Sequence, residues 1–262
     1  MSQPLAMAGG EALARLAAAP AAVLFLDLDG TLAPFVDQPE RARIPPATRR
    51  TLARLQHTGA RVVLVSGRRV RSAVAVARCP VAAVIGNHGA DILLGGRHRP
   101  WIQAEAAPLR DAVRVLAPLL EAWPGSRLEV KDFSLGVHWR GPAARLDPLL
   151  HAVRRALRHA PLSVNSGRRV VDVKPDGVSK GTAVIRWLST VERNRIPPQA
   201  ILYAGDDTTD QDAFRVLPAP ATTIAVGPRT HGARYRTRNT MSLARWLKRL
   251  ARARSHLNGS GS

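Results

Sequence analysis

The sequence of 262 residues has little of several features that mark common protein classes. Its single cysteine, Cys79, excludes an internal disulfide framework and a zinc site built from cysteines. It has no run of about 18 uncharged apolar residues, so we predict no transmembrane helix. The alanine-rich start is interrupted by Glu11 and Arg15, and we interpret it as a short helix rather than a signal peptide. We therefore expect a cytoplasmic protein with no membrane partner, and the apolar content of 45% is enough for a folded core.

Acidic and aromatic residues are also scarce. The chain has 39 Lys and Arg against 19 Asp and Glu, which gives a formal net charge of +20, and only 4% of its residues are aromatic. A positive field attracts phosphate backbones, but so few aromatic side chains leave no obvious platform for stacking bases. The basic residues are spread through the chain rather than clustered. We therefore expect no nucleic-acid binding as the main function, and a positive field that also attracts a small anionic substrate.

The first third of the sequence alternates apolar strands with helices. Strands are expected at 23–28, 60–67 and 82–89, with helices at 46–59 and 70–79 between them. This order predicts a parallel sheet with right-handed crossovers. Ligands bind at the carboxyl ends of the strands in such sheets, which is where the segments DLDGT, SGR and GNHG lie.

The segment from 98 to 174 has a different pattern. It reads as helix, two strands, helix, two strands, which predicts a small α+β unit with an antiparallel sheet. The α/β pattern then returns until about residue 227, and a basic helix follows at 243–254. We predict an α/β protein with a Rossmann-like, doubly wound parallel-sheet core, formed by 1–97 and 175–262, and an inserted smaller α+β cap domain at 98–174.

Two aspartates follow the first apolar strand. Asp27 and Asp29 are two residues apart, so their side chains can converge on one small site. Two negative charges at such a short distance require a cation between them, or one of the two carboxyl groups must hold a proton. A magnesium ion with oxygen ligands meets this requirement. The alternative is an ordinary turn, because Asp-Gly is a common turn signal.

A second acidic cluster, GDDTTDQD at 205–212, follows a later strand. Asp206, Asp207 and Asp210 stand where a helix is expected to begin, and helix capping explains one or two of them. A hard divalent cation explains the whole cluster.

Three further polar residues stand at element ends. Lys180 begins a helix, where it could hold a phosphate beside the acids. Ser66 and Arg68 end a buried strand, although Ser66 could as easily cap the next helix.

Taken in order, DLDGT, Ser66, Lys180 and GDDTTD resemble the four motifs of the haloacid-dehalogenase-like phosphatases. With EVKDFSLGVHWR and VDVKPDGVSKGTA, the chain more closely resembles the trehalose-6-phosphate phosphatase family over about residues 23–227. The resemblance implies an Mg²⁺-dependent phosphatase that hydrolyses trehalose 6-phosphate through an aspartyl-phosphate. The alternatives are a phosphatase for another sugar phosphate, of sucrose or mannosyl type, and a basic nucleic-acid-binding module with a vestigial core.

The resemblance also implies roles for the residues. Asp27 would be the nucleophile, and Asp29 would act as acid and then as base. Magnesium would be bound by Asp27, by the backbone carbonyl of Asp29 and by Asp206, with Asp207 or Asp210 nearby or acting through water. The residues implied in holding phosphate are Gly30, Ser66, Arg68 and Lys180.

Recognition of the sugar would fall to two groups of residues. The first comes from the core loop, Asn87 and His88. The second comes from the inserted unit: Glu129, Lys131, His138, Arg140 and Asp172, the last at a position where the family usually has glutamate. We also expect the inserted unit to close over the site, and the chain to be a monomer with a sugar phosphate as its substrate.

Overall fold

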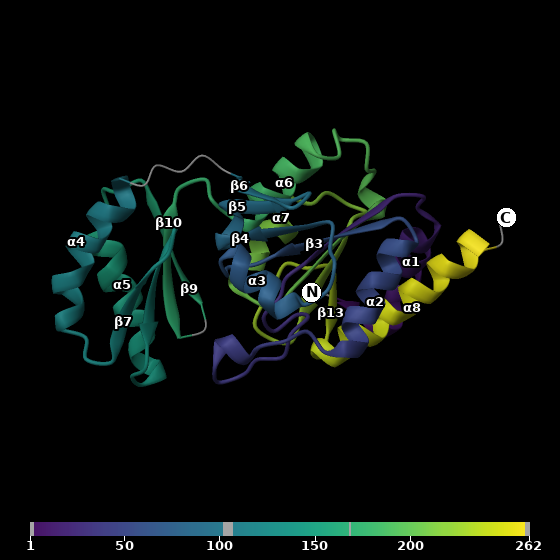
Figure 1. Ribbon diagram of the computed structural model, residues 1–262. Helices are drawn as coiled ribbons and strands as arrows, with labels where there is room; N and C mark the ends of the chain where they lie inside the picture. The colour runs from purple at the N-terminus through teal and green to yellow at the C-terminus, as the bar shows by residue number, and fades with distance from the viewer. Residues whose placement is uncertain (1–2, 102–106, 168, 260–262) are drawn as a thin grey trace. The chain divides into compact units, whose positions relative to one another are not determined.

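A computed structural model describes residues 3–101, 107–167 and 169–259 of the chain (Figure 1). The chain divides into two compact units. Unit 1 combines Met1–Trp101 with Ser179–Ser262, and unit 2 is Ile102–Val178. Each unit has its own hydrophobic core. The first unit is therefore built from two segments of the chain that are separated by the whole of the second.

Unit 1 contains a nine-stranded sheet with the order β1-β13-β12-β11-β2-β3-β4-β5-β6. The strands from β1 to β4 in this order are parallel, and β5 and β6 join at one edge in antiparallel pairs. The predicted α/β fold with a mostly parallel sheet is confirmed, and the antiparallel edge is an addition. The strands are β1 (Gln3–Pro4), β2 (Ala22–Leu26), β3 (Ala60–Val65), β4 (Ala83–Gly86), β5 (Asp91–Leu94), β6 (Arg97–Pro100), β11 (Ile201–Gly205), β12 (Thr222–Val226) and β13 (Tyr235–Thr237).

Helices cover both faces of this sheet because its central strands are apolar on both faces. Leu24 and Leu26 share a core with α1 (Leu5–Ala18), α2 (Pro46–His57), α3 (Val70–Ala77) and α8 (Thr240–Gly259). Phe25 points the other way, and its ring meets Trp187 edge-on at a centroid distance of 6.4 Å. That face carries α6 (Lys180–Thr190) and α7 (Gln211–Val216).

The run at 82–89 forms a strand that ends in a polar loop, as the sequence predicts: β4 ends at Gly86 and a 3-10 turn follows at Asn87–Gly89. Asn87 and His88 both have positive φ angles, 47° and 58°. Two left-handed residues in succession are not strand conformations, so the extended backbone ends at Gly86.

Unit 2 is a four-stranded antiparallel sheet with two helices. The sheet has the order β7-β8-β10-β9, formed by β7 (Ser126–Val130), β8 (Leu135–Trp139), β10 (Val170–Pro175) and β9 (Leu162–Gly167). The helices are α4 (Ala107–Glu121) and α5 (Leu146–Ala156). Alternate strand residues such as Val137 and Val171 pack with Leu116 and Val153 of the helices. The opposite face of the sheet is therefore left to the intervening polar residues.

Among the described residues, no helix combines the length and the apolar character that crossing a membrane requires.

Candidate active site

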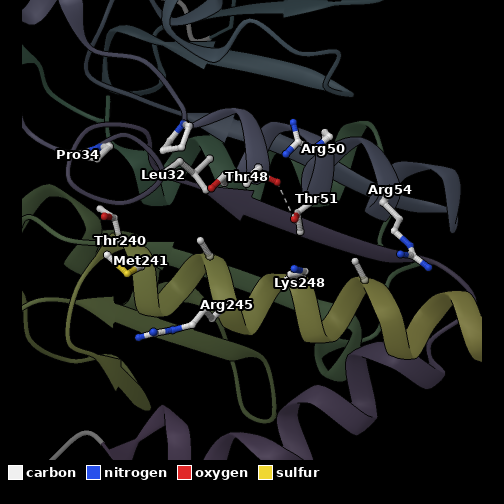
Figure 2. Close-up of a pocket in the computed structure, with 14 residues that line it drawn as sticks. Leu32, Pro34, Thr48, Arg50, Thr51, Arg54, Thr240, Met241, Arg245 and Lys248 are labelled. Atoms are coloured by element: carbon white, nitrogen blue, oxygen red, sulfur yellow. Dashed lines mark hydrogen bonds between the residues drawn. The ribbon is translucent and has the colours of Figure 1, made fainter.

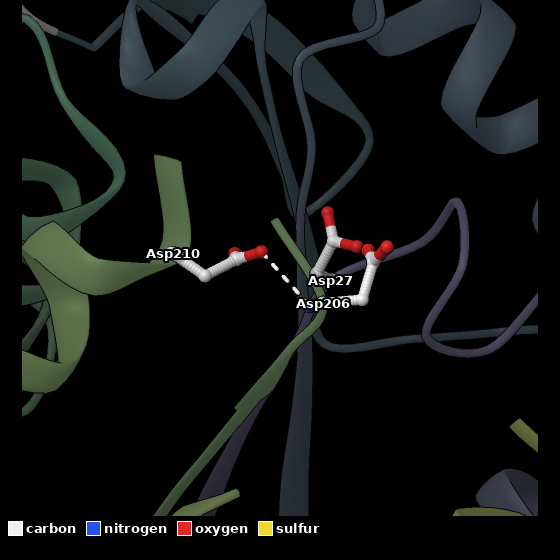
Figure 3. Close-up of side chains that lie close together, drawn as sticks. All are labelled: Asp27, Asp206 and Asp210. Carbon is white, nitrogen blue, oxygen red and sulfur yellow. Dashed lines mark hydrogen bonds between the residues drawn. The ribbon is translucent and has the colours of Figure 1, made fainter. Parts of the chain in front are cut away.

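The two acidic motifs meet at the carboxyl ends of two neighbouring strands. β2 and β11 pair in parallel, with Leu26 opposite Ala204, and the backbone N–H of Asp27 donates to the Ala204 carbonyl at 2.9 Å. Asp27 follows β2, and Asp206 follows β11. One carboxylate oxygen each of Asp27, Asp206 and Asp210 lies within 4.8 Å of the others (Figure 3). The sheet thus gathers three acids from opposite ends of the sequence.

Lys180, the first residue of α6, lies within this cluster. Its ammonium donates to Asp27 Oδ1 at 2.7 Å and to Asp210 Oδ1 at 2.8 Å. Its side chain is 3% exposed. Burial alone would lower the pKa of Lys180, but the charges of Asp210 and Asp27 outweigh burial and raise it. The lysine is therefore a permanent cation between two carboxylates.

Asp210 has its hydrogen-bonding capacity largely filled. Its Oδ1 accepts from Lys180 and from the Tyr203 hydroxyl, the latter at 2.7 Å. Its Oδ2 accepts the backbone N–H groups of Asp206 and Asp207, at 3.1 and 3.0 Å. Asp210 thus positions Lys180 and the loop after β11. A metal ion would have to displace these bonds to bind it directly.

Asp27 and Asp206 keep more of their oxygens available. Asp206 is contacted by the Thr31 hydroxyl at 3.4 Å and by the Arg229 guanidinium at 3.9 Å. Burial, together with the charges of Asp27 and Asp210, raises the pKa of Asp206 to about 9. Burial also raises the pKa of Asp27, to about 7, although Lys180 opposes the shift. Two buried carboxylates that repel each other form a donor set that suits a hard cation such as Mg²⁺.

Asp29 forms a two-pronged ion pair with Arg68. The guanidinium donates from Nε to Oδ2 at 2.6 Å and from Nη2 to Oδ1 at 2.7 Å. Burial would lower the pKa of Arg68, but the bond and the charge of Asp29 raise it overall. Both carboxylate oxygens of Asp29 are therefore engaged by one guanidinium group.

Gly30 and Ser66 take local roles in this structure. Gly30 has φ = +83°, and a Cβ built on it would lie 2.3 Å from Asp206 Oδ2. Its N–H donates to the Ala33 carbonyl at 2.8 Å, so it closes a turn. Ser66 is 1% exposed, and its Oγ accepts the backbone N–H of Arg68 at 3.1 Å. Glycine is thus required at position 30 by both conformation and space.

The loop after β4 places Asn87 in an unusual state. Its side chain is fully buried, and neither its amide nitrogen nor its amide oxygen has a hydrogen-bond partner among the described residues. The next residue, His88, lies so close to Gly67 that a Cβ there would come within 2.5 Å of the imidazole. Buried amide groups without partners and successive left-handed residues are costly, and such features concentrate at functional sites.

The candidates in unit 2 share one face of its sheet. Glu129, Gly136 and Asp172 are cross-strand neighbours in one row. Glu129 accepts a bond from His138 Nε2 at 2.7 Å and lies 3.8 Å from Lys131 Nζ. Burial would raise the pKa of Glu129, but His138 and Lys131 lower it overall.

This polar face lies opposite the core face. The side chains of His138 and Glu129 lie over Gly136, because a Cβ built there would come within 3.3 Å of His138 Nε2 and 3.6 Å of Glu129 Oε2. Arg140 follows β8 directly and is exposed.

The sequence predicted Asp207 near the metal site or acting on it through water, and it did not predict three other residues that contact the acids. The Asp207 carboxylate accepts the backbone N–H of Thr208 at 2.7 Å, so it caps the 3-10 turn Thr208–Asp210. The overlooked residues touch the acids directly: Thr31, Tyr203 and Arg229. Tyr203 could have been found from the sequence, because a tyrosine in a fully buried strand requires a hydrogen-bond partner for its hydroxyl group.

Comparison with known sequences identifies the family. The family model for trehalose-phosphatase matches residues 25–243. The chain belongs to the trehalose-phosphatase family. The match covers most of each segment of unit 1 and the whole of the described part of unit 2.

The relatives of this family member are longer proteins. Trehalose-phosphate phosphatases of Mycobacterium tuberculosis and Mycobacterium bovis are 32% identical over 241 residues, which cover 87% of this chain and 61% of theirs. An uncharacterized glycosyl hydrolase of Mycobacterium tuberculosis is 31% identical over 245 residues, 87% of this chain and 18% of that protein. The chain thus spans about three fifths of the length of the phosphatases that it matches.

Solved structures agree on the fold. The C-terminal domain of Candida albicans trehalose-6-phosphate phosphatase superposes with a TM-score of 0.82 at 20% identity, covering 96% of this chain and 98% of that domain. A haloacid dehalogenase-like hydrolase from Bacteroides thetaiotaomicron superposes with a TM-score of 0.65 at 18% identity, covering 87% of this chain and 99% of that hydrolase. This member of the trehalose-phosphatase family therefore has the haloacid-dehalogenase-like fold.

Proposed function

We propose that this member of the family is a phosphatase that hydrolyses trehalose 6-phosphate with the aid of Mg²⁺. One observation carries the chemistry: a buried ammonium group, Lys180, lies between Asp27 and Asp210 with the Asp206 carboxylate alongside. This arrangement fixes one oxygen of Asp27 and leaves the other for attack. Family membership supports the substrate.

In the first step, an Asp27 oxygen attacks phosphorus and the bond from phosphorus to the sugar oxygen breaks. Asp29 gives its proton to the departing sugar oxygen. In the second step, water attacks the aspartyl-phosphate and Asp29 takes the proton of that water. The bond from phosphorus to Asp27 then breaks, which releases phosphate and restores the carboxylate.

The ion pair of Asp29 with Arg68 sets the order of events. We infer that Arg68 exchanges Asp29 for a phosphate oxygen when the substrate binds, since a guanidinium binds phosphate in the same two-pronged way as a carboxylate. The exchange places a cation on the substrate and frees Asp29 to take up its proton. Lys180 and Ser66 hold further phosphate oxygens.

The site fits a magnesium ion, and Asp27, Asp206 and the backbone carbonyl of Asp29 are the groups that would hold it. The bound ion would supply positive charge that offsets the negative charge on the phosphoryl group and on the two carboxylates. Asp210 contributes by fixing Lys180 and the loop that carries Asp206. Thr31 helps to orient the Asp206 carboxylate.

Recognition of the sugar is assigned to Asn87 and His88 of unit 1 and to the polar sheet face of unit 2. A buried amide without partners is suited to a sugar hydroxyl, because it can donate and accept at once. On unit 2, Glu129 and Asp172 offer acceptors and Lys131 offers a donor on the polar face of the sheet.

The test is phosphate release from a panel of sugar phosphates, with Mg²⁺ and with a chelator. We expect trehalose 6-phosphate to be the best substrate, and both the chelator and Asp27→Asn to abolish release. The variant should retain the wild-type circular dichroism spectrum. Equal turnover of sucrose-type or mannosyl-type phosphates would contradict the substrate assignment. Activity that survives in Asp27→Asn would contradict the mechanism.

A comparison of two substrates tests the assignment of sugar recognition to unit 2. Glu129→Gln and Asp172→Asn should raise the KM for trehalose 6-phosphate about tenfold or more, because each removes a charged acceptor for sugar hydroxyls. Turnover of a small aryl phosphate should stay within about twofold, since it offers no sugar to bind. Equal losses on both substrates would assign these residues a structural role.

A further inference from the structure

A groove of about 580 Å³ lies between α2 and α8 in unit 1 (Figure 2). Its lining extends along α8 from Thr240 to Ala251, about 16 Å at the rise of an α-helix. Most of the lining surface is apolar. Its apolar residues are Leu32, Pro34, Pro45, Ala47, Met241, Ala244 and Ala251. None of the residues to which we assign catalysis or binding lines it.

Among the described residues that line the groove, every charged side chain is positive. Arg50 and Arg54 come from α2, and Arg245 and Lys248 come from α8 (Figure 2). All four side chains are exposed. The sequences of α2 and α8 contain no aspartate or glutamate, so neither helix offers a charge that could neutralise its own cations.

Hydrogen bonds orient two of these cations without neutralising them. Arg54 Nε donates to the Ser255 hydroxyl at 3.0 Å, and Arg245 Nη2 donates to the Ser242 hydroxyl at 3.2 Å. A hydroxyl group accepts such a bond but brings no countercharge. The groove therefore combines an apolar floor with an uncompensated cationic rim, which is complementary to a molecule that is apolar at one end and anionic at the other.

We propose that the groove between α2 and α8 binds a small amphiphilic anion, a molecule with an apolar body and one anionic group. The apolar body lies on the alanine and proline floor, where it is removed from water. The anionic group pairs with the cations of the rim. This site is independent of the phosphatase chemistry, and it stands whether or not that chemistry is assigned correctly.

The size of the groove selects this occupant over larger ones. Pockets for small molecules typically measure about 300–1,000 Å³, and this groove falls within that range. An α-helix about 10 Å across and 16 Å long has a volume of more than about 1,200 Å³, so it would stand mostly outside the groove. A membrane surface is flat and cannot fill a concave floor between two helices.

Calorimetric titration of the full chain with decanoate, below its micelle concentration, tests the proposal. We expect saturable binding of one decanoate per chain. Acetate, which has the charge without the apolar body, should not bind detectably. Decyltrimethylammonium, which has the apolar body with the opposite charge, should also fail to bind. Several weak and equivalent decanoate sites per chain would indicate general attraction to a basic protein and would overturn the proposal.

Variants locate the site. The double variant Arg245→Glu/Lys248→Glu should weaken decanoate binding by about tenfold or more, because two attractive charges become repulsive. The control is Arg249→Glu/Arg252→Glu, which makes the same change of net charge at exposed positions of α8 outside the groove. It should alter the dissociation constant by less than about threefold.

A change of shape without a change of charge gives a second measurement. Ala244→Trp fills part of the floor and should abolish binding, whatever happens to the charge variants. Thermal unfolding of each variant verifies that the chain is folded. Equal weakening by the rim and control variants would overturn the proposal, as would undiminished binding in Ala244→Trp. Binding to anionic vesicles or acidic helical peptides without binding to decanoate would also overturn it, since the occupant would then be a macromolecule.

Discussion

Lys180 and the three aspartates around it depend on one another. Removing a cation from a buried cluster leaves the remaining charges without compensation, and that cost generally exceeds the net contribution of the ion pair itself. Asp27 and Asp210 are both buried and both bonded to this one ammonium group. Lys180, which we propose holds a phosphate oxygen, is therefore also a residue on which folding depends.

Lys180→Met should lower the free energy of unfolding by about 3–5 kcal/mol, because it leaves two buried carboxylates without their cation. Urea unfolding in the presence of a chelator measures the loss. The control is Lys248→Met at an exposed position, which should change the same quantity by less than about 0.5 kcal/mol. A loss of less than about 1 kcal/mol in Lys180→Met would show that the carboxylates are solvated or protonated without it.

The pH dependence of the metal-free protein follows from Asp206. Burial and the neighbouring acids raise its pKa to about 9, so the folded chain holds a proton that the unfolded chain releases near pH 4. Between these values the unfolded state binds fewer protons, and stability falls as the pH rises. Asp206→Asn removes the loss of stability that the raised pKa of Asp206 causes as the pH rises.

In the presence of a chelator, the free energy of unfolding of Asp206→Asn should therefore exceed that of the wild type only slightly near pH 4. The difference should grow to at least about 1 kcal/mol by pH 8. The same substitution should abolish phosphate release. Urea unfolding over this pH range measures the difference. A variant that is less stable than the wild type at pH 8 would show that the Asp206 charge is compensated without a metal ion.

At the scale of elements, the apolar strands and amphipathic helices could be predicted, because burial imposes a period on the sequence. The strand at 23–28 and the helix at 46–59 correspond to β2 and α2. The edge strands could not be predicted, because every residue of β6 (RHRP) is exposed and β1 has only two residues. The polar loop after β4 was predicted, but its left-handed backbone was not, because neighbouring segments hold that geometry through the bonds of Asn87 N–H to Arg68 and of His88 N–H to Ser66.

The candidate site was predictable to a similar extent. Motif order placed Asp27, Lys180 and Asp206 at one edge of the sheet, because strand ends in a parallel sheet converge. The pairing of Asp29 with Arg68 and the Tyr203 bond to Asp210 depend on side-chain directions in three dimensions. No spacing rule encodes those directions.

Arg254 of α8 holds two helix ends together. Its fully buried guanidinium donates to the carbonyls of Leu16 and Ala19, at 2.5 and 2.8 Å, and of Thr58, at 2.9 Å. It thereby satisfies the carbonyls that are left over where α1 and α2 end. Burial lowers the pKa of Arg254.

Arg254→Met should therefore destabilise the fold by about 2–4 kcal/mol, since three carbonyls lose their donors. Arg252→Met, two residues away and exposed, should cost less than about 0.5 kcal/mol. Thermal unfolding of both variants measures the contrast. Phosphate release per folded molecule should match the wild type in both, because neither residue touches the candidate active site. Equal stability of the two variants would contradict the bridging role.

At the scale of the whole molecule, the two segments of unit 1 end near each other. The Trp101 indole donates to the Ala183 carbonyl of α6 at 3.4 Å, and the Arg186 guanidinium lies 5.2 Å from the centre of the Trp101 ring. Both units have cores of their own. Unit 1 therefore does not need unit 2 to close its sheet.

Replacement of residues 102–178 by a flexible Gly/Ser linker of about ten residues should leave a unit 1 that unfolds cooperatively. Mg²⁺ should still raise its unfolding temperature, because Asp27 and Asp206 both belong to unit 1. Turnover of trehalose 6-phosphate should fall far more than turnover of a small aryl phosphate. Circular dichroism and calorimetry follow the first two outcomes, and a chain without a cooperative transition would contradict the independence of unit 1.

The split of unit 1 has a consequence for synthesis on the ribosome. Asp27 is made 153 residues before Lys180, and Thr31 is made 175 residues before Asp206. Until β11 emerges, β2 (AVLFL) lacks one of its two neighbours and presents an unpaired apolar edge. Unit 2 is complete before that point and can fold first. A chain that terminates before β11 therefore carries a finished unit 2 joined to an aggregation-prone half-sheet, and it has Asp27 and Lys180 without Asp206 and Asp210.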